Sequence, residues 1–214
     1  MPVLNYVVIV VAAYLLGSIP TGYLVGRAKG IDIRTVGSGN IGATNVFRML
    51  GKGAGAFALV VDGLKGYAAC SWLCDALLAL LGVTVADTEL YRILAGIAAV
   101  LGHNYTCWLR FKGGKGIATS AGVFFALAPL AAGVALAAWI IVFALSGYVS
   151  VASMAAAVAL PATVWLTADS LTLRIVTTAL GLLAILKHKS NIERLLNGTE
   201  RRFGRKSATQ EVTK

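Results

Sequence analysis

Charged side chains are scarce in this chain of 214 residues. Only 13% of the residues are Asp, Glu, Lys or Arg, whereas a soluble globular domain carries about 25%. Hydrophobic residues make up 58% of the chain, and the mean hydropathy is +0.80. The composition therefore excludes a water-soluble enzyme and a nucleic-acid-binding domain, and it is typical of a protein that crosses a membrane several times.

Cysteine is also rare, with three residues in the whole chain. Cys70 and Cys74 lie one helical turn apart in an apolar segment, and Cys107 stands alone without a second pair of metal ligands. Small secreted disulfide scaffolds are much richer in cysteine. We therefore expect small buried side chains at these positions, with no metal and no cofactor.

Acidic residues are fewer than basic ones, nine against 19, and the excess is not evenly spread. Basic residues cluster in residues 27–52, 110–115 and 187–214, which together carry a net charge of +12, while the rest of the chain carries −2. Short basic segments next to membrane spans stay in the cytoplasm. We therefore predict that these three segments share the cytoplasmic face.

Apolar stretches cover residues 3–25, 54–82 and 90–109, and residues 116–168 contain no charge at all. Turns predicted at residues 128–133, 146–147 and 169–170 divide the remaining apolar region. The pattern predicts an all-α, polytopic membrane protein with about seven transmembrane helices, the N-terminus outside and the C-terminus in the cytoplasm.

The weak point of this topology is residues 117–146, which would form two spans of roughly 15 residues each, shorter than usual. A re-entrant hairpin there would give the same orientation of the flanking segments. We expect one domain over residues 1–214, with a flexible tail at 206–214.

The first basic segment contains a glycine-rich stretch followed by Arg48. Its candidate ligand-binding residues are Ser38, Gly39, Asn40, Gly42, Thr44 and Asn45. Free backbone N–H groups, small polar side chains and a guanidinium suit a phosphate. The alternative is a flexible connection between two helices.

The second basic segment reads Lys112, Gly113, Gly114, Lys115 and Gly116. Successive glycine N–H groups before a helix, flanked by two ammonium groups, predict an anion nest. It is not a Walker A loop, because Gly116 stands where Ser or Thr would hold magnesium. A simple positive-inside anchor is the alternative.

The third segment places His188 and Asn191 three residues apart, on one helix face. Ser150 and Ser153 come to the same membrane face in the predicted topology. His103 lies inside the third span, where a packed, hydrogen-bonded histidine is the simpler expectation. Asp62 and Lys65 lie inside the second span, and we expect them to pair with each other, because an unpaired charge there is unfavourable.

Residues 38–45, 102–116 and 188–200 resemble, in this order, the three signature motifs of the bacterial acyl-phosphate:glycerol-3-phosphate acyltransferases of the PlsY type. The resemblance covers nearly the whole chain. It implies transfer of a fatty acyl group from acyl phosphate to the 1-hydroxyl of sn-glycerol 3-phosphate, giving lysophosphatidic acid and phosphate at the cytoplasmic face of the bacterial inner membrane. The implied partners are these two substrates and the lipid bilayer, with no nucleic acid and no obligate protein partner.

On this basis we assign catalytic roles to Ser38, Arg48, Lys115, His188 and Asn191. Substrate binding is assigned to Gly39, Asn40, Gly42, Thr44, Asn45, His103, Lys112, Gly113, Gly114, Gly116 and Ser153. Structural or secondary roles are assigned to Asp62, Lys65 and Glu200.

Two alternatives concern what the chain does and how it does it. A small membrane transporter for phosphate or an organophosphate would also use basic and glycine-rich sites, but it would be expected to show inverted repeats, which we do not detect. For an acyltransferase, direct attack by the glycerol hydroxyl is preferred to an acyl-enzyme on Ser38. Either a substrate phosphate or His188 would then accept the proton.

Overall fold

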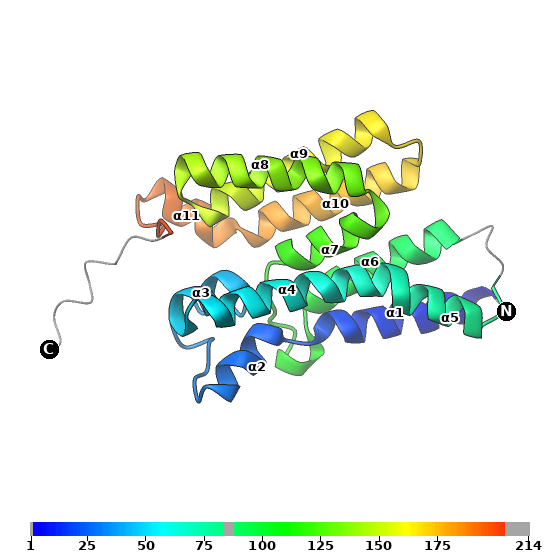
Figure 1. The fold of residues 1–214 in the computed structure, drawn as a ribbon, viewed down its shortest axis with the longest axis horizontal. Helices are drawn as coiled ribbons and strands as arrows, with labels where there is room; N and C mark the ends of the chain where they lie inside the picture. The colour runs from blue at the N-terminus through cyan, green and yellow to red at the C-terminus, as the bar shows by residue number, and fades with distance from the viewer. Residues whose placement is uncertain (1, 84–87, 204–214) are drawn as a thin grey trace, which may run out of the picture.

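The computed structural model describes residues 2–83 and 88–203, and every regular element in these ranges is a helix (Figure 1). The predicted tail at 206–214 lies outside the described residues. The first half of the chain contains α1 (Pro2–Ser18), α2 (Thr21–Ala28), α3 (Ala43–Leu50), α4 (Lys52–Ala68), the π-helix η1 (Ala69–Leu73), α5 (Cys74–Leu80) and α6 (Thr88–Asn104). The second half contains the 3₁₀-helix η3 (Cys107–Leu109), α7 (Ile117–Leu127), α8 (Pro129–Ser146), α9 (Val149–Thr167), α10 (Leu171–Lys187) and α11 (Lys189–Leu196).

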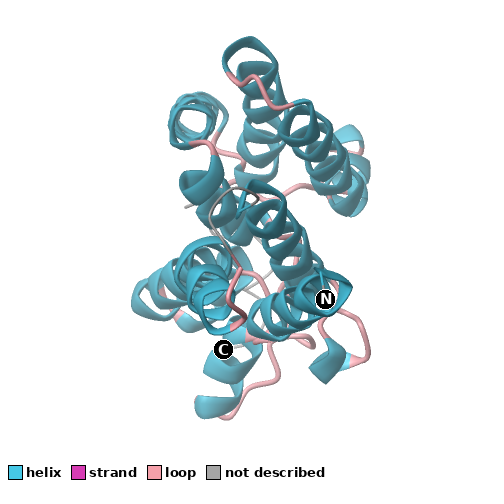
Figure 2. Ribbon diagram, turned by 90° about the vertical axis from the view of Figure 1, so that its right-hand side faces the viewer, coloured by secondary structure: helices cyan, strands magenta, loops and turns pink. Residues whose placement is uncertain are grey.

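The long helices lie side by side in two groups (Figures 1 and 2). In one group α1 packs on α6, in the other α8, α9 and α10 pack together, and α7 lies between the groups against α4. Glycine makes the closest of these contacts. A Cβ on Gly122 of α7 would strike the carbonyl oxygen of Gly63 in α4, and one on Gly66 would strike that of Thr119. Small residues of this kind allow membrane helices to approach backbone to backbone.

Four helical stretches are long and apolar enough to cross a membrane: Val3–Ala28, Lys52–Leu80, Pro129–Ser146 and Val149–Thr167. The pair Leu171–Lys187 and Lys189–Leu196, bent by 52°, would make a fifth. Large aliphatic side chains cover their outer surface, as at Leu145 and Leu166, which are 83% and 86% exposed. These features are those of a multi-pass membrane protein, while the number of crossings stays a prediction.

The first predicted span corresponds to the candidate span Val3–Ala28, within which a short break at Pro20 separates α1 from α2. One detail of the predicted spans is wrong. The turn predicted at 128–133 is reduced to Ala128, since Pro129 starts α8; proline suits a first helical position because its φ is already helical and the N–H it lacks has no intrahelical partner there. Residues 117–146 therefore form helices of 11 and 18 residues.

The core of the bundle contains the two cysteines of the second apolar stretch. Cys70 and Cys74 are fully buried and free, as expected from the sequence. Cys70 packs in one cluster with Val123 and Phe124 of α7. The short helix α7 is therefore held from both sides, and its first residues are fixed where the basic segment 110–116 ends.

Candidate active site

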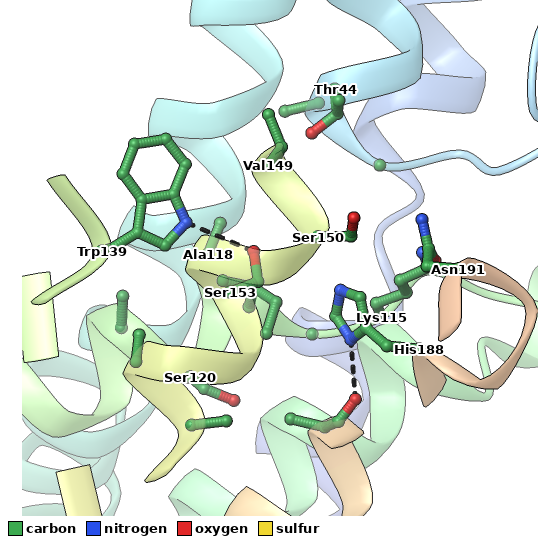
Figure 3. A pocket seen from close by; sticks show the side chains of 18 of the residues that line it. Thr44, Lys115, Ala118, Ser120, Trp139, Val149, Ser150, Ser153, His188 and Asn191 are labelled. Carbon is green, nitrogen blue, oxygen red and sulfur yellow. Dashed lines mark hydrogen bonds between the residues drawn. The ribbon is translucent and has the colours of Figure 1, made fainter. Parts of the chain in front are cut away.

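A cavity of about 650 Å³ opens where the three glycine-rich and basic segments meet (Figure 3). It is lined by these residues of the three segments: Ser38, Asn40, Gly42, Thr44, Asn45, Arg48, Lys115, Gly116, His188, Asn191 and Glu200. Asp62, His103, Ser150 and Ser153 also line it. Most of the predicted site residues, which lie far apart in the sequence, therefore surround one space.

The side chain of Asn45 shapes the first segment. Its amide nitrogen donates to the carbonyl oxygens of Ile33, Val36 and Asn40, at 3.1, 3.1 and 2.9 Å. Its oxygen accepts from the backbone N–H of Ser38 at 3.0 Å. Asn45, predicted to bind substrate, therefore holds the loop in shape.

The first turn of α3 faces the cavity through Ala43 and Thr44. The first N–H groups of a helix have no partner within it and favour an anion. Arg48 lies one turn further along α3, and its guanidinium donates to the carbonyl oxygen of Arg201 at 3.1 Å. Burial lowers the pKa of Arg48. This end of the cavity therefore offers a hydroxyl, helix N–H groups and a partly desolvated cation.

The anion nest predicted at Gly113 and Gly114 is wrong. Their N–H groups already donate to the carbonyl oxygens of Asn104 and His103, at 3.1 and 3.0 Å. A Cβ on Gly114 would strike the imidazole of His103, so these glycines serve close packing. Gly39, Lys112, Gly113 and Gly114 lie outside the residues that line the cavity, and the side chain of Lys112 is exposed.

Lys115 starts a chain of polar contacts that joins the second segment to the third. Its ammonium group donates to the side-chain oxygen of Asn191. The Asn191 amide nitrogen donates to Glu200 Oε1 at 2.7 Å, and Arg194 Nε donates to Glu200 Oε2 at 2.7 Å. Ser150 Oγ donates to the same carboxylate at 2.8 Å. Glu200 therefore orients Asn191, which in turn positions Lys115.

These contacts change the acidity of the groups involved. Burial, followed by the positive charge of Arg194, lowers the pKa of Lys115 to about 8. Burial opposes ionisation of Glu200, but its hydrogen bonds from Asn191, Arg194 and Ser150 outweigh this effect and lower its pKa. The carboxylate is therefore ionised at neutral pH, and the ammonium group keeps most of its charge.

His188 lies just after the end of α10, where Lys189 begins α11. Its Nδ1 lies 2.7 Å from the carbonyl oxygen of Ala184 (Figure 3). A ring nitrogen facing a carbonyl must carry a proton, so in the neutral ring Nε2 is an acceptor. Burial and the nearby charge of Lys115 lower the pKa of His188 to about 4. His188 is therefore a neutral hydrogen-bond acceptor at pH 7.

Asp62 and Lys65 form the predicted ion pair, with Nζ and Oδ1 2.8 Å apart and both side chains 3% exposed. Thr21 Oγ1 also donates to Asp62 at 2.9 Å, and Lys65 donates to the carbonyl oxygen of Ile19 at 2.8 Å. His103 Nδ1 lies 3.6 Å from Asp62. This cluster fixes α4 against the break between α1 and α2, and Asp62 and His103 reach the cavity wall from it.

Among the residues that line the cavity, sequence reasoning missed Arg194 and Trp139. Arg194 follows Asn191 by three residues in α11, and that spacing could have indicated it. Trp139 donates from its indole N–H to Ser153 Oγ at 3.2 Å, joining α8 to α9 across the cavity (Figure 3). No pattern in the apolar α8 distinguishes Trp139 from the other large residues of that helix.

Away from the polar end, the cavity continues as an apolar arm between α7, α8, α9 and α10. Its walls are formed by Phe124, Phe125, Ala132, Ala135, Leu136, Ala156, Ala157, Leu160, Leu180 and Gly181. Five of these are alanine or glycine, which leave room along the arm. One continuous space thus joins a polar end, lined by Arg48 and Lys115, to an apolar channel.

Comparisons with known proteins identify the family of this chain. Residues 7–198 match the model of the glycerol-3-phosphate acyltransferase family. The chain is 51% identical over 197 residues to the glycerol-3-phosphate acyltransferase of Geobacter metallireducens, covering 92% of this chain and 97% of that protein. It is 45% identical over 203 residues to that of Geotalea daltonii, covering 93% and 98%.

Two crystal structures of PlsY, an integral membrane glycerol 3-phosphate acyltransferase, have the same fold. The glycerol 3-phosphate form is 39% identical with a TM-score of 0.83, covering 93% of this chain and 96% of that one. The lysophosphatidic acid form is 38% identical with a TM-score of 0.81, covering 93% and 95%. This chain belongs to the glycerol-3-phosphate acyltransferase family, as a membrane enzyme of the PlsY type.

Proposed function

We propose that the chain transfers a fatty acyl group from acyl phosphate to the 1-hydroxyl of sn-glycerol 3-phosphate, giving lysophosphatidic acid and phosphate. One observation carries the proposal: a single cavity joins a polar end, at Lys115, Arg48 and the start of α3, to an apolar arm. Both substrates carry a phosphate, and one carries an acyl chain. No observation on the described residues favours a transporter.

The phosphates bind at the polar end. Arg48 and Lys115 supply positive charge from two sides, and the N-terminus of α3 supplies N–H groups beside Thr44. Gly116, whose φ is +79°, brings the backbone to the cavity directly after Lys115. Ser38 and Asn40 complete this end and orient the donor.

The chemical step needs little activation, because acyl phosphate is a mixed anhydride. The glycerol hydroxyl oxygen attacks the acyl carbon and forms the new ester bond, while the bond from this carbon to the phosphate oxygen breaks. Charge develops on the carbonyl oxygen and on the departing phosphate. Fixed donors and cations at the polar end stabilise this charge without reorganising.

The hydroxyl proton goes to a substrate phosphate or to His188. A histidine with a pKa of about 4 is a weaker base than a phosphate monoester, whose second pKa is about 6. We therefore assign the proton to a substrate phosphate and give His188 Nε2 the task of orienting the hydroxyl.

Direct transfer excludes an acyl-enzyme. In the described part of the chain no histidine is hydrogen-bonded to Ser38, so no base is poised to activate it. A nucleophilic serine normally has such a base within hydrogen-bond reach. Ser38 therefore acts through its hydroxyl as a contact to substrate.

Purified enzyme tests both parts of the proposal. Acyl phosphate alone should release no phosphate, and labelled acyl phosphate should leave no acyl group on the denatured protein. Addition of glycerol 3-phosphate should start phosphate release and lysophosphatidic acid formation in equal amounts. An acyl ester on Ser38 that forms as fast as turnover would refute direct transfer. Phosphate release without glycerol 3-phosphate would refute the proposal that glycerol 3-phosphate is the acyl acceptor.

For the orientation, we propose seven crossings in the bacterial inner membrane, with the N-terminus outside and the cavity open to the cytoplasm. The excess of basic residues at 27–52, 110–115 and 187–214 supports this orientation. The helix α7, with 11 residues, is only about 16 Å long. It begins directly after the basic segment 110–115 and Gly116, which stay at the cytoplasmic face, so α7 makes a short crossing.

A further inference from the structure

A second cavity, of about 480 Å³, lies outside the catalytic one. It is lined by Tyr23, Arg34, Trp108, Leu109, Arg110 and Lys112, and we call it the Arg110 cleft. None of these residues lines the catalytic cavity. Tyr23 lies near the end of the candidate span Val3–Ala28, so the cleft lies at one end of that span.

The Arg110 cleft carries positive charge without compensation. Arg34 is paired with Asp32 at 2.6 Å and lies over the ring of Tyr23, 4.8 Å from its centre. In residues 2–83 and 88–203, neither Arg110 nor Lys112 has a carboxylate partner. Two cations that face one concave surface without an anion form a site for a phosphate group.

Aromatic side chains flank these cations. Trp108 and Phe111 are each 63% exposed, and both belong to the loop that carries Arg110 and Lys112. Indole rings such as that of Trp108 are enriched at the membrane–water interface. They would contact the glycerol backbone and the first methylene groups of a lipid, which a free phosphate lacks.

The backbone holds this loop in an unfavourable shape. Arg110 and Phe111 both have positive φ, 54° and 59°, in the left-handed region that favours glycine. The N–H of Phe111 donates to the carbonyl oxygen of Thr106 at 3.0 Å, and Thr106 Oγ1 donates to that of Ser18 at 2.6 Å. The hydrogen bond from Thr106 to α1 helps to hold this strained backbone in place. Backbone strain that a fold retains is typical of functional positions, which indicates that the orientation of the Arg110 and Phe111 side chains has a function.

We propose that the Arg110 cleft binds the phosphate headgroup of an anionic phospholipid in the leaflet that surrounds the enzyme. Arg110 and Lys112 hold the phosphate, and Trp108 and Phe111 lie against the lipid below it. The site is separate from the catalytic cavity, so the inference does not depend on the acyl-transfer proposal. It also accounts for Lys112, which the sequence pairs with Lys115 but which faces away from the active site.

Native mass spectrometry of the full-length protein in detergent, titrated with phosphatidylglycerol, tests this proposal. Arg110→Gln with Lys112→Gln should weaken lipid retention about tenfold or more. The matched control, Lys29→Gln with Lys52→Gln, removes the same charge from exposed positions outside the cleft and should retain lipid like the wild type. Arg110→Lys with Lys112→Arg keeps both charges and should largely restore retention.

The same titration separates a lipid from a free anion. Phosphatidylcholine, which has no net charge, should be retained less than phosphatidylglycerol, and Trp108→Ala should weaken retention of the anionic lipid. Equal losses in the cleft variant and the control would overturn the proposal, since charge alone would then explain retention. Displacement of the lipid by inorganic phosphate at equal concentration would overturn it in favour of a soluble anion.

Discussion

The ammonium group of Lys115 donates a hydrogen bond to the side-chain oxygen of Asn191, 76 residues further along the chain. Asn191 is itself fixed by Glu200. Asn191→Ala should therefore free the lysine and lower kcat/KM about tenfold or more, as expected for a hydrogen bond to a charged group. Steady-state kinetics check this, with Asn197→Ala, an exposed residue at the end of the same helix, as the control.

The lowered pKa of Lys115 predicts that substrate binding depends on pH. Its pKa is lowered to about 8, so the free enzyme loses this positive charge as the pH rises through 8. The KM for the phosphate substrate that Lys115 holds, glycerol 3-phosphate or acyl phosphate, should rise above this pH, whereas Lys115→Arg, which stays protonated, should abolish the rise even if its activity is low. KM values for both substrates that do not change between pH 7 and 9.5 in the wild type would contradict the role of Lys115 in binding phosphate.

The apolar arm predicts chain-length selectivity. Ala135 of α8 lines the arm, whereas Ala137 of the same helix is exposed on the outer surface. Ala135→Phe should shift the preference toward shorter acyl chains, because the ring occupies space that a long chain needs. Ala137→Phe should leave it unchanged. Competition between acyl phosphates of different length, read by mass spectrometry of the product, measures both.

The buried pair of Asp62 and Lys65 predicts a stability effect. Lys65→Met leaves the Asp62 charge buried and should destabilise the protein by about 3–5 kcal/mol. Arg92→Gln breaks a salt bridge to Asp75 that is 38% and 49% exposed, and should change stability by about 1 kcal/mol or less. Thermal unfolding in one detergent compares the two. Equal losses of stability in the two variants would contradict a larger contribution from the buried ion pair.

Accessibility to an impermeant thiol reagent checks the orientation. Single cysteines at Lys29, Arg110 and Lys189, in a cysteine-free background, should resist the reagent in intact cells. A cysteine at Glu89, an exposed residue near the start of α6 at the other end of the bundle, should react. Reaction at any of the first three positions would contradict a shared cytoplasmic face.

Much of this architecture could be predicted from the sequence, because membrane spans and basic segments depend on composition over many residues. Most of the predicted polar residues of the cavity lie in short motifs, so their types and spacing could be recognised, whereas Arg194 was missed. The roles of Asn45, Gly113 and Gly114 could not be predicted. Whether an amide or an N–H group faces a ligand or a neighbouring carbonyl depends on contacts such as those from Gly113 to Asn104.

The break at Ala128 shows the same limit in the fold. A proline and a glycine four residues apart are typical of a turn, yet Pro129 begins α8 and Gly133 continues it. Packing between α8 and α9 stabilises the continuous helix, and tertiary contacts override local preference of this size.

The continuity of the polar end with the apolar arm also bears on how a cycle of catalysis ends. Lysophosphatidic acid combines the phosphate of one substrate with the alkyl chain of the other, so the product complements the whole cavity. Its departure requires that the cations at Lys115 and Arg48 release the headgroup. Burial lowers the pKa of Lys115, so its positive charge decreases as the pH rises. We therefore expect inhibition by accumulated product to weaken in alkaline medium.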